Sequence, residues 1–204
     1  MSKPTFYFDL GSPFAYLAAE RLHDVLGEQV VWQPVSLGAL FKLTGRSSWS
    51  MGDPERRQVG MAEVERRARL YGLPPVRWPD PWPGNYLMAM RAATFAYRDG
   101  RGHEFTMQAF RNAFQERSDL SIPAEILRAA EDAGLDPRAV EAATQDPDVK
   151  LAVRDATENA HQLGVFGVPT IAIEGELFWG DDRLEDAAAH LRFVDERRLH
   201  ERKL

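Results

Sequence analysis

No cysteine occurs among the 204 residues of this chain. Structural disulfides, thiolate metal sites and a cysteine nucleophile are therefore excluded, together with dithiol redox chemistry. This absence is compatible with a reducing compartment. The chain also lacks an apolar run of about 18 residues that could span a membrane, and Met1–Pro4 leads into a strand-like run without an apolar signal segment. These absences predict a soluble, cytoplasmic protein with no membrane partner.

Basic charge and ligand patterns are also scarce. Lys and Arg total 25 against 31 Asp and Glu, which gives a formal net charge of −6 and a pI near 5.4. Nucleic acid is not expected as a partner of so acidic a chain. The five histidines include no pair at metal-ligand spacing, and no glycine-rich phosphate loop is present. We therefore assign no metal and no nucleotide.

The chain begins with a strand–helix–strand pattern. Thr5–Leu10 is short and aromatic and ends before a glycine, which is typical of a buried strand. Ser12 is a good N-cap, and Pro13 suits the first position of a helix that ends at Gly27. A second strand is predicted over Gln29–Val35, so the unit favours a parallel pair with a right-handed crossover.

The middle of the chain, residues 38–163, has helical patterns broken by proline and glycine loops. Sheet patterns return at Ile171–Ile173 and Leu177–Trp179, which flank a turn and predict a hairpin. A last amphipathic helix is predicted to begin at Asp181 and to end near Leu199. This order is that of an α/β thioredoxin-like fold, with β-α-β and β-β-α halves and an inserted all-helical domain. The predicted domains are residues 1–37 together with 164–204, and residues 38–163.

Three motifs carry a resemblance to a known family. They are Phe6-Tyr7-Phe8-Asp9-Leu10-Gly11-Ser12-Pro13-Phe14-Ala15-Tyr16-Leu17, Val165-Phe166-Gly167-Val168-Pro169-Thr170 and Phe178-Trp179-Gly180-Asp181-Asp182-Arg183-Leu184, with a weaker match at Gly84-Asn85-Tyr86. In these motifs and in its order of elements, the chain resembles bacterial 2-hydroxychromene-2-carboxylate isomerases. These are relatives of kappa-class glutathione transferases in the DsbA-like thioredoxin superfamily. Thioredoxin-like proteins usually hold a Cys-x-x-Cys pair where this chain has Ser12 and Ala15, so the resemblance implies that glutathione, as the cofactor, supplies the sulfur.

Ser12 is the catalytic residue that the resemblance implies. Backbone N–H groups and the helix dipole favour an anion at a helix start, so a thiolate bound there is stabilised. The serine hydroxyl would donate a hydrogen bond to the thiolate of glutathione. The alternative is that Ser12 only caps the helix.

The other glutathione contacts implied by the resemblance lie near the second sheet half. We expect a cis peptide bond before Pro169, with the Val168 backbone pairing with glutathione as with an added strand. The γ-glutamyl end would be held by the turn made of Trp179, Gly180, Asp181 and Asp182. A simple turn at Pro169 and helix capping by the two aspartates are the plainer alternatives.

The resemblance also implies a small aromatic carboxylate as the substrate, which needs a positive or donor-rich site. Candidates for contacting it are Lys42, Asn85, Tyr86 and Arg91. Lys42 follows the second strand, where the resembling isomerases place a substrate-contacting lysine. An apolar pocket could be lined by Phe14, Trp49, Trp78, Trp82 and Tyr86. A surface role for the polar candidates and a core role for the aromatic ones remain open.

The function implied by the resemblance is glutathione-dependent isomerisation of 2-hydroxychromene-2-carboxylate-type compounds to trans-o-hydroxybenzylidenepyruvate, through a transient glutathione adduct. It would serve the breakdown of aromatic compounds, in a homodimer. One alternative is a kappa-like glutathione transferase, which releases the adduct as product. Another is a non-enzymatic member of the superfamily that binds glutathione or a peptide.

Overall fold

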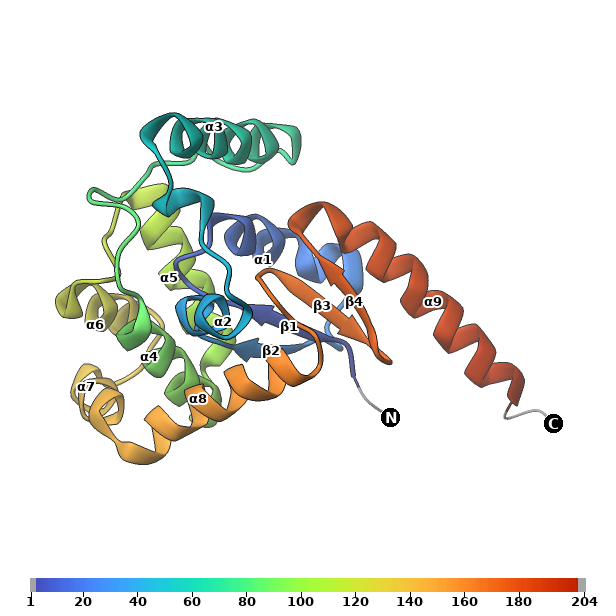
Figure 1. Cartoon of the computed structure of the whole chain (residues 1–204). Helices are drawn as coiled ribbons and strands as arrows, with labels where there is room; N and C mark the ends of the chain where they lie inside the picture. Colours follow the sequence, from blue (N-terminus) through green and yellow to red (C-terminus); the bar gives the residue numbers. More distant parts are fainter. Residues whose placement is uncertain (1–2, 202–204) are drawn as a thin grey trace.

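The computed structural model describes residues 3–201, and a four-stranded sheet forms its centre (Figure 1). The strand order is β2-β1-β3-β4, with β1 at Thr5–Phe8, β2 at Val31–Pro34, β3 at Thr170–Ile173 and β4 at Glu176–Trp179. β1 and β2 are parallel, and β1–β3 and β3–β4 are antiparallel. The predicted β-α-β and β-β-α halves are confirmed, and they pair through the two strands at the centre of the sheet.

The sheet register brings distant segments of the chain to one edge. Tyr7, near the end of β1, lies opposite Thr170 at the start of β3, and Thr170 lies opposite Trp179 at the end of β4. β2 runs parallel to β1 and ends at the same edge, since Phe8 lies opposite Pro34. The chain segments that follow β1, β2 and β4, and the one that precedes β3, therefore meet there.

Helices connect the two sheet halves. Helix α1 spans Pro13–Leu26, as predicted, and joins β1 to β2. Between β2 and β3 come α2 (Leu37–Thr44), the 3-10 turn η1 (Trp49–Met51), α3 (Pro54–Leu70), α4 (Leu87–Arg98), α5 (Gly102–Glu116), α6 (Pro123–Asp132), α7 (Pro137–Gln145) and α8 (Pro147–Gln162). Asp136 and Asp146 cap α7 and α8, because each carboxylate accepts a hydrogen bond from the backbone N–H two residues on.

The last helix differs from the prediction at its start. Asp181–Arg183 form a 3-10 turn, η2, and α9 follows over Leu184–Glu201. Neither Asp181 nor Asp182 caps the turn, because Gly180 occupies the cap position and no side chain bonds there. The capping alternative is therefore wrong for these two aspartates.

One continuous hydrophobic core joins the sheet to the helical segment. Phe8 of β1 lies 6.0 Å from Phe110 of α5, between ring centroids, and both rings are fully buried. In Figure 1 the helices α4 to α8 gather on the side of β1 and β2, whereas α9 packs along α1 and β3. The predicted domain boundaries therefore cut across a shared core. The division of the chain into two domains stays a prediction. Within residues 3–201, no helix has both the length and the apolarity needed to cross a membrane.

Candidate glutathione and substrate site

A cavity of about 820 Å³ opens at the sheet edge where the four segments meet. Its lining comes from the turn before α1, from α2 and the loop that follows it, from the segment before α4, and from the turn before β3 together with Trp179. Five of the residues predicted for the site line this cavity: Ser12, Asn85, Tyr86, Val168 and Trp179.

Ser12 lies on the floor of the cavity at the start of α1. Its Oγ accepts a hydrogen bond from the Ala15 N–H at 3.2 Å, so the side chain does cap the helix. The hydroxyl also points toward the Val168 carbonyl, at an Oγ–O distance of 3.5 Å. A contact of that length is weak, so little free energy is lost when the hydroxyl turns to a better acceptor. The cap and the implied thiolate contact are therefore compatible.

The segment opposite Ser12 has the predicted peptide geometry. The Val168–Pro169 bond is cis, which confirms the prediction. The Val168 N–H donates to no residue among those described. The neighbouring backbone is held by other bonds, since Gly180 N–H donates to the Pro169 carbonyl at 3.0 Å and Thr170 Oγ1 donates to the Gly167 carbonyl at 2.7 Å. A fixed backbone with a free N–H suits pairing with an extended peptide.

Asp9 lines the cavity as well, and the sequence assigns it no role. It is 6% exposed, and its two carboxylate oxygens accept hydrogen bonds from Gly11 N–H and Leu37 N–H, both at 2.8 Å. Burial raises the pKa of Asp9 to about 6, and the two backbone hydrogen bonds only partly oppose this. Asp9 therefore ties the Ser12 turn to the start of α2, and its charge changes close to neutral pH.

Tyr86 covers the same turn from the segment before α4. A Cβ at Gly11 would lie 2.1 Å from the Tyr86 ring, so only glycine allows this ring to approach the backbone so closely. The Tyr86 oxygen accepts a hydrogen bond from Gly84 N–H at 2.9 Å, and burial raises the pKa of Tyr86 to about 12. Tyr86 therefore stays a neutral phenol whose proton is available to an acceptor in the cavity. The neighbouring Asn85 is exposed, and its Oδ1 accepts from Leu87 N–H.

Aromatic rings form much of the remaining wall. Trp49 lies 6.0 Å from Phe14 and 5.4 Å from Trp82, between ring centroids, and all three residues line the cavity. Trp78 packs behind Trp82 and donates its indole N–H to Glu65, so it supports the wall without lining it. The predicted apolar pocket therefore exists with four of its five predicted aromatic residues.

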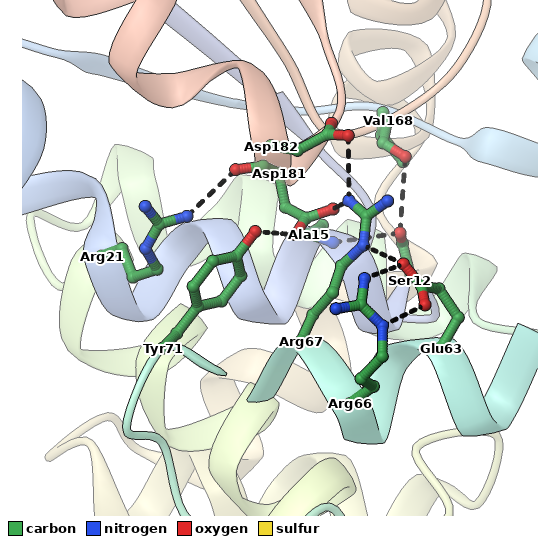
Figure 2. Close-up of polar contacts among 10 residues, drawn as sticks. All are labelled: Ser12, Ala15, Arg21, Glu63, Arg66, Arg67, Tyr71, Val168, Asp181 and Asp182. Carbon is green, nitrogen blue, oxygen red and sulfur yellow. Dashed lines mark hydrogen bonds and ion pairs between the residues drawn. The ribbon is translucent and has the colours of Figure 1, made fainter. Parts of the chain in front are cut away.

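Asp181 and Asp182 lie outside the cavity lining, in a polar network that Figure 2 shows. The Asp181 side chain is 1% exposed; it accepts from Arg67 Nη1 at 2.7 Å and from the Tyr71 hydroxyl at 2.9 Å. Burial raises the pKa of Asp181 although the Arg67 charge opposes the rise. The Asp182 side chain is 54% exposed, and its carboxylate lies 3.2 Å from the same Arg67. Both Asp181 oxygens are thus occupied within the protein, whereas Asp182 remains accessible.

Two predicted substrate residues do not face the cavity. Lys42 is exposed on α2 and lies one residue beyond Phe41, which does line the cavity, so the helical phase turns the lysine away. Arg91 points toward α7, where its Nη1 lies 3.5 Å from the Thr144 carbonyl. The cations of the lining are instead Arg46 and Arg56. Arg46 could have been suspected from sequence, because it follows Gly45, a residue type typical of a helix end.

Fold and site together define a class: a thioredoxin-like protein with an inserted helical segment, in which a serine takes the place of the first redox cysteine. Residues 5–192 match the model of the DSBA-like thioredoxin domain, and the chain belongs to that family.

Named relatives extend over nearly the whole chain. It is 29% identical over 192 residues to a 2-hydroxychromene-2-carboxylate isomerase of Sphingobium xenophagum, covering 91% of this chain and 96% of the relative. It is 25% identical over 202 residues to human glutathione S-transferase kappa 1, covering 91% and 88%. Among solved structures, a 2-hydroxychromene-2-carboxylate isomerase superimposes with a TM-score of 0.81 at 22% identity, covering 97% of this chain and 98% of that one.

Proposed function

We propose that the protein is a glutathione-dependent isomerase of 2-hydroxychromene-2-carboxylate-type substrates. The observation that carries the proposal is the Ser12 hydroxyl at the start of α1, opposite the cis-Pro169 segment, in a chain without any cysteine. A thioredoxin-like thiol site without a thiol of its own is suited to a thiol that arrives with a ligand. The relative from Sphingobium xenophagum bears the name of this isomerase.

The residues of the site fit glutathione, which is an extended tripeptide with one thiol, one ammonium group and two carboxylates. The free Val168 N–H suits its backbone, and the half-exposed Asp182 suits the ammonium group of its γ-glutamyl end. Trp179 is 52% exposed beside this segment and offers an apolar face. When bound, glutathione supplies the nucleophilic thiolate that changes the geometry of a substrate double bond.

The protein's own residues would prepare that chemistry. Ser12 would turn its hydroxyl from the Val168 carbonyl to the sulfur and donate a hydrogen bond there, while the start of α1 favours the negative charge. The aromatic wall would hold the substrate ring and exclude water. Tyr86, as a neutral phenol, would donate a hydrogen bond to a substrate oxygen.

A spectroscopic assay tests the proposal. Protein and glutathione are mixed with 2-hydroxychromene-2-carboxylate, and both the ultraviolet spectrum and the free thiol are followed. We expect isomerisation without loss of glutathione. For Ser12→Ala we expect kcat/KM to fall about ten- to a hundredfold, which corresponds to one hydrogen bond to a charged sulfur.

Ser36→Ala is the matched control for the lost helix cap. Ser36 caps α2 in the same way, through an Oγ that accepts from Ala39 N–H at 3.3 Å, and it also lines the cavity. Both variants lose about 0.5–2 kcal/mol of stability. Only Ser12→Ala should lose most of its activity, and a Ser12→Ala variant as active as Ser36→Ala would refute the role of the serine.

A kappa-like glutathione transferase is the second candidate, and the similarity to human glutathione S-transferase kappa 1 favours it. The thiol site would be the same, and the product would carry the glutathione away. Stoichiometric loss of glutathione with a chlorodinitrobenzene-type electrophile, and no isomerisation, would select this candidate. The homodimer implied by the family resemblance stays a prediction.

A further inference from the structure

The charged residues of the cavity lie on two different walls. The lining contains three of them among residues 3–201: Asp9 beside Ser12, and Arg46 and Arg56 on the side of η1 and α3. Neither arginine forms an ion pair with a carboxylate in the part of the chain that the structure describes. With two unpaired arginines against one aspartate, the lining has a net positive charge, which attracts an anionic ligand.

Arg46 is held at a defined place near the thiol site. It follows Gly45, whose φ of 68° ends α2, and the Arg46 N–H donates to the Phe41 carbonyl at 3.0 Å. Its guanidinium carbon lies 4.1 Å from the centroid of the Phe166 ring. Phe166 is two residues before Val168, whose carbonyl faces the Ser12 hydroxyl. The Arg46 side chain therefore packs against the short segment, Phe166 to Val168, that faces the proposed thiolate.

A stacked arginine is a good carboxylate receptor. The Phe166 ring occupies the face of the Arg46 guanidinium and leaves N–H groups at its edge, where a carboxylate binds through two parallel hydrogen bonds. The next residues add hydroxyl donors, because Ser47, Ser48 and Ser50 also line the cavity. Residues 45–51 contain no acidic side chain that would compete for the guanidinium.

We propose that Arg46 binds the carboxylate of the aromatic substrate and that it takes the role predicted for Lys42. The substrate ring would then lie against the wall of Phe14, Trp49 and Trp82, between the cation and Ser12. The identity of the substrate rests on the proposed function; the carboxylate site itself rests on the cavity and its unpaired cation.

Arg56 is a weaker candidate than Arg46. It lies in the first turn of α3, and no aromatic ring supports its guanidinium among residues 3–201. A long unsupported side chain loses more rotamer freedom when it binds, so its net contribution is smaller. We therefore expect a graded series in which Arg46 matters most, Arg56 less, and Lys42 not at all.

Calorimetric titration with an unreactive aromatic acid tests this order without any turnover. The probes are 3-(2-hydroxyphenyl)propanoate, which has no conjugated double bond for a thiolate to attack, and its uncharged amide, each added to protein with glutathione present. We expect Arg46→Ala to weaken binding of the acid about tenfold, the equivalent of one charge-assisted contact, and to leave the amide unchanged. Arg46→Lys should bind the acid with an affinity between those of the wild type and Arg46→Ala. Lys42→Ala should bind it like the wild type. Thermal melting of each variant confirms that it is folded.

Three outcomes would overturn the assignment. These are a loss of acid binding in Lys42→Ala but not in Arg46→Ala, an equal loss for acid and amide in Arg46→Ala, and wild-type protein that does not prefer the acid. A separate glutathione titration covers the remaining possibility, because weaker glutathione binding with unchanged acid binding would assign Arg46 to a glutathione carboxylate. If the wild type prefers the acid through Arg46 but isomerises nothing, the proposed function fails and the carboxylate site stands.

Discussion

The turn before α1 and the turn before α9 each bury an aspartate close to the proposed glutathione site, but they stabilise it differently. Asp9 is held by the backbone N–H groups of Gly11 and Leu37 and faces the cavity without a cation. Asp181 is held by the side chains of Arg67 and Tyr71, which both come from the region of α3. One aspartate therefore depends on dipoles and the other on an opposite charge.

This difference shows which aspartate is available for chemistry. Both Asp181 carboxylate oxygens are occupied in joining α3 to the segment after β4, and Figure 2 shows Arg67 reaching across to Asp181. Asp9 has no opposite charge to keep it ionised, so its proton is lost or gained near pH 6. The sequence motif had pointed to Asp181 as a ligand contact, whereas the cavity contains Asp9.

Breaking the Arg67–Asp181 pair should have the largest effect on stability. Arg67→Met leaves a carboxylate that is 1% exposed without its cation, which costs roughly 3–5 kcal/mol for a buried pair. Urea denaturation measures the loss. Arg66→Met is the control, because Arg66 pairs with Glu63 at the surface and its loss should cost far less stability. Equal losses in the two variants would contradict the buried-pair interpretation.

Asp9→Asn should change how stability depends on pH. The pKa of Asp9 in the folded protein, about 6, exceeds its ordinary value of 3.8, so the folded state holds the proton more tightly than the unfolded chain. This contribution to stability is complete below about pH 4 and is lost as the pH rises through 6. Asparagine mimics the protonated acid and does not titrate. The stability of the variant relative to the wild type should therefore rise by about 3 kcal/mol over this pH range.

Asp181→Asn is the matched comparison for that experiment. It leaves Arg67 without its charged partner, whereas Asp9→Asn removes no ion pair and loses one of the two backbone hydrogen bonds, because the asparagine NH2 cannot accept. Denaturation curves of both variants between pH 4 and 7 separate the two kinds of stabilisation. If both variants lost stability relative to the wild type as the pH rose, ionised Asp9 would have a stabilising partner other than the two backbone N–H groups.

Asp182→Asn should have the smallest effect, and on binding rather than on stability. If the half-exposed Asp182 pairs with the ammonium group of glutathione, its loss should weaken binding up to about fivefold, because an exposed ion pair contributes at most about 1 kcal/mol. Calorimetry with glutathione measures this. Glutathione that lacks its γ-glutamyl residue should bind wild type and variant alike, and any difference there would assign the effect elsewhere.

The sequence predicted the parts of the site that depend on local chemistry and on sheet order. Ser12 before Pro13 indicated a capped helix, and Val168-Pro169 before a strand indicated the facing segment; the register of β1 with β3 brings them together. The fold class followed from the order of strands and helices and is confirmed.

The sequence predicted less well where long-range contacts or helix phase decide. Asp181 finds its partner Arg67 at a separation of 114 residues, which no local pattern reveals. Lys42 lies off the cavity lining because the rotation of α2 exposes the lysine and places Phe41 in the cavity, and that rotation depends on where the short helix begins and ends. A single aspartate at a strand end resembles an ordinary turn residue, so Asp9 gave no distinctive pattern.

We propose above all that this cysteine-free site stabilises a thiolate brought by glutathione. The most direct test is to titrate the thiol of bound glutathione by its thiolate ultraviolet absorbance, in wild type and in Ser12→Ala. We predict that the wild-type complex lowers the thiol pKa relative to free glutathione, and that Ser12→Ala returns it toward the free value. A bound thiol that ionises at the same pH as free glutathione in the wild-type complex would contradict the account.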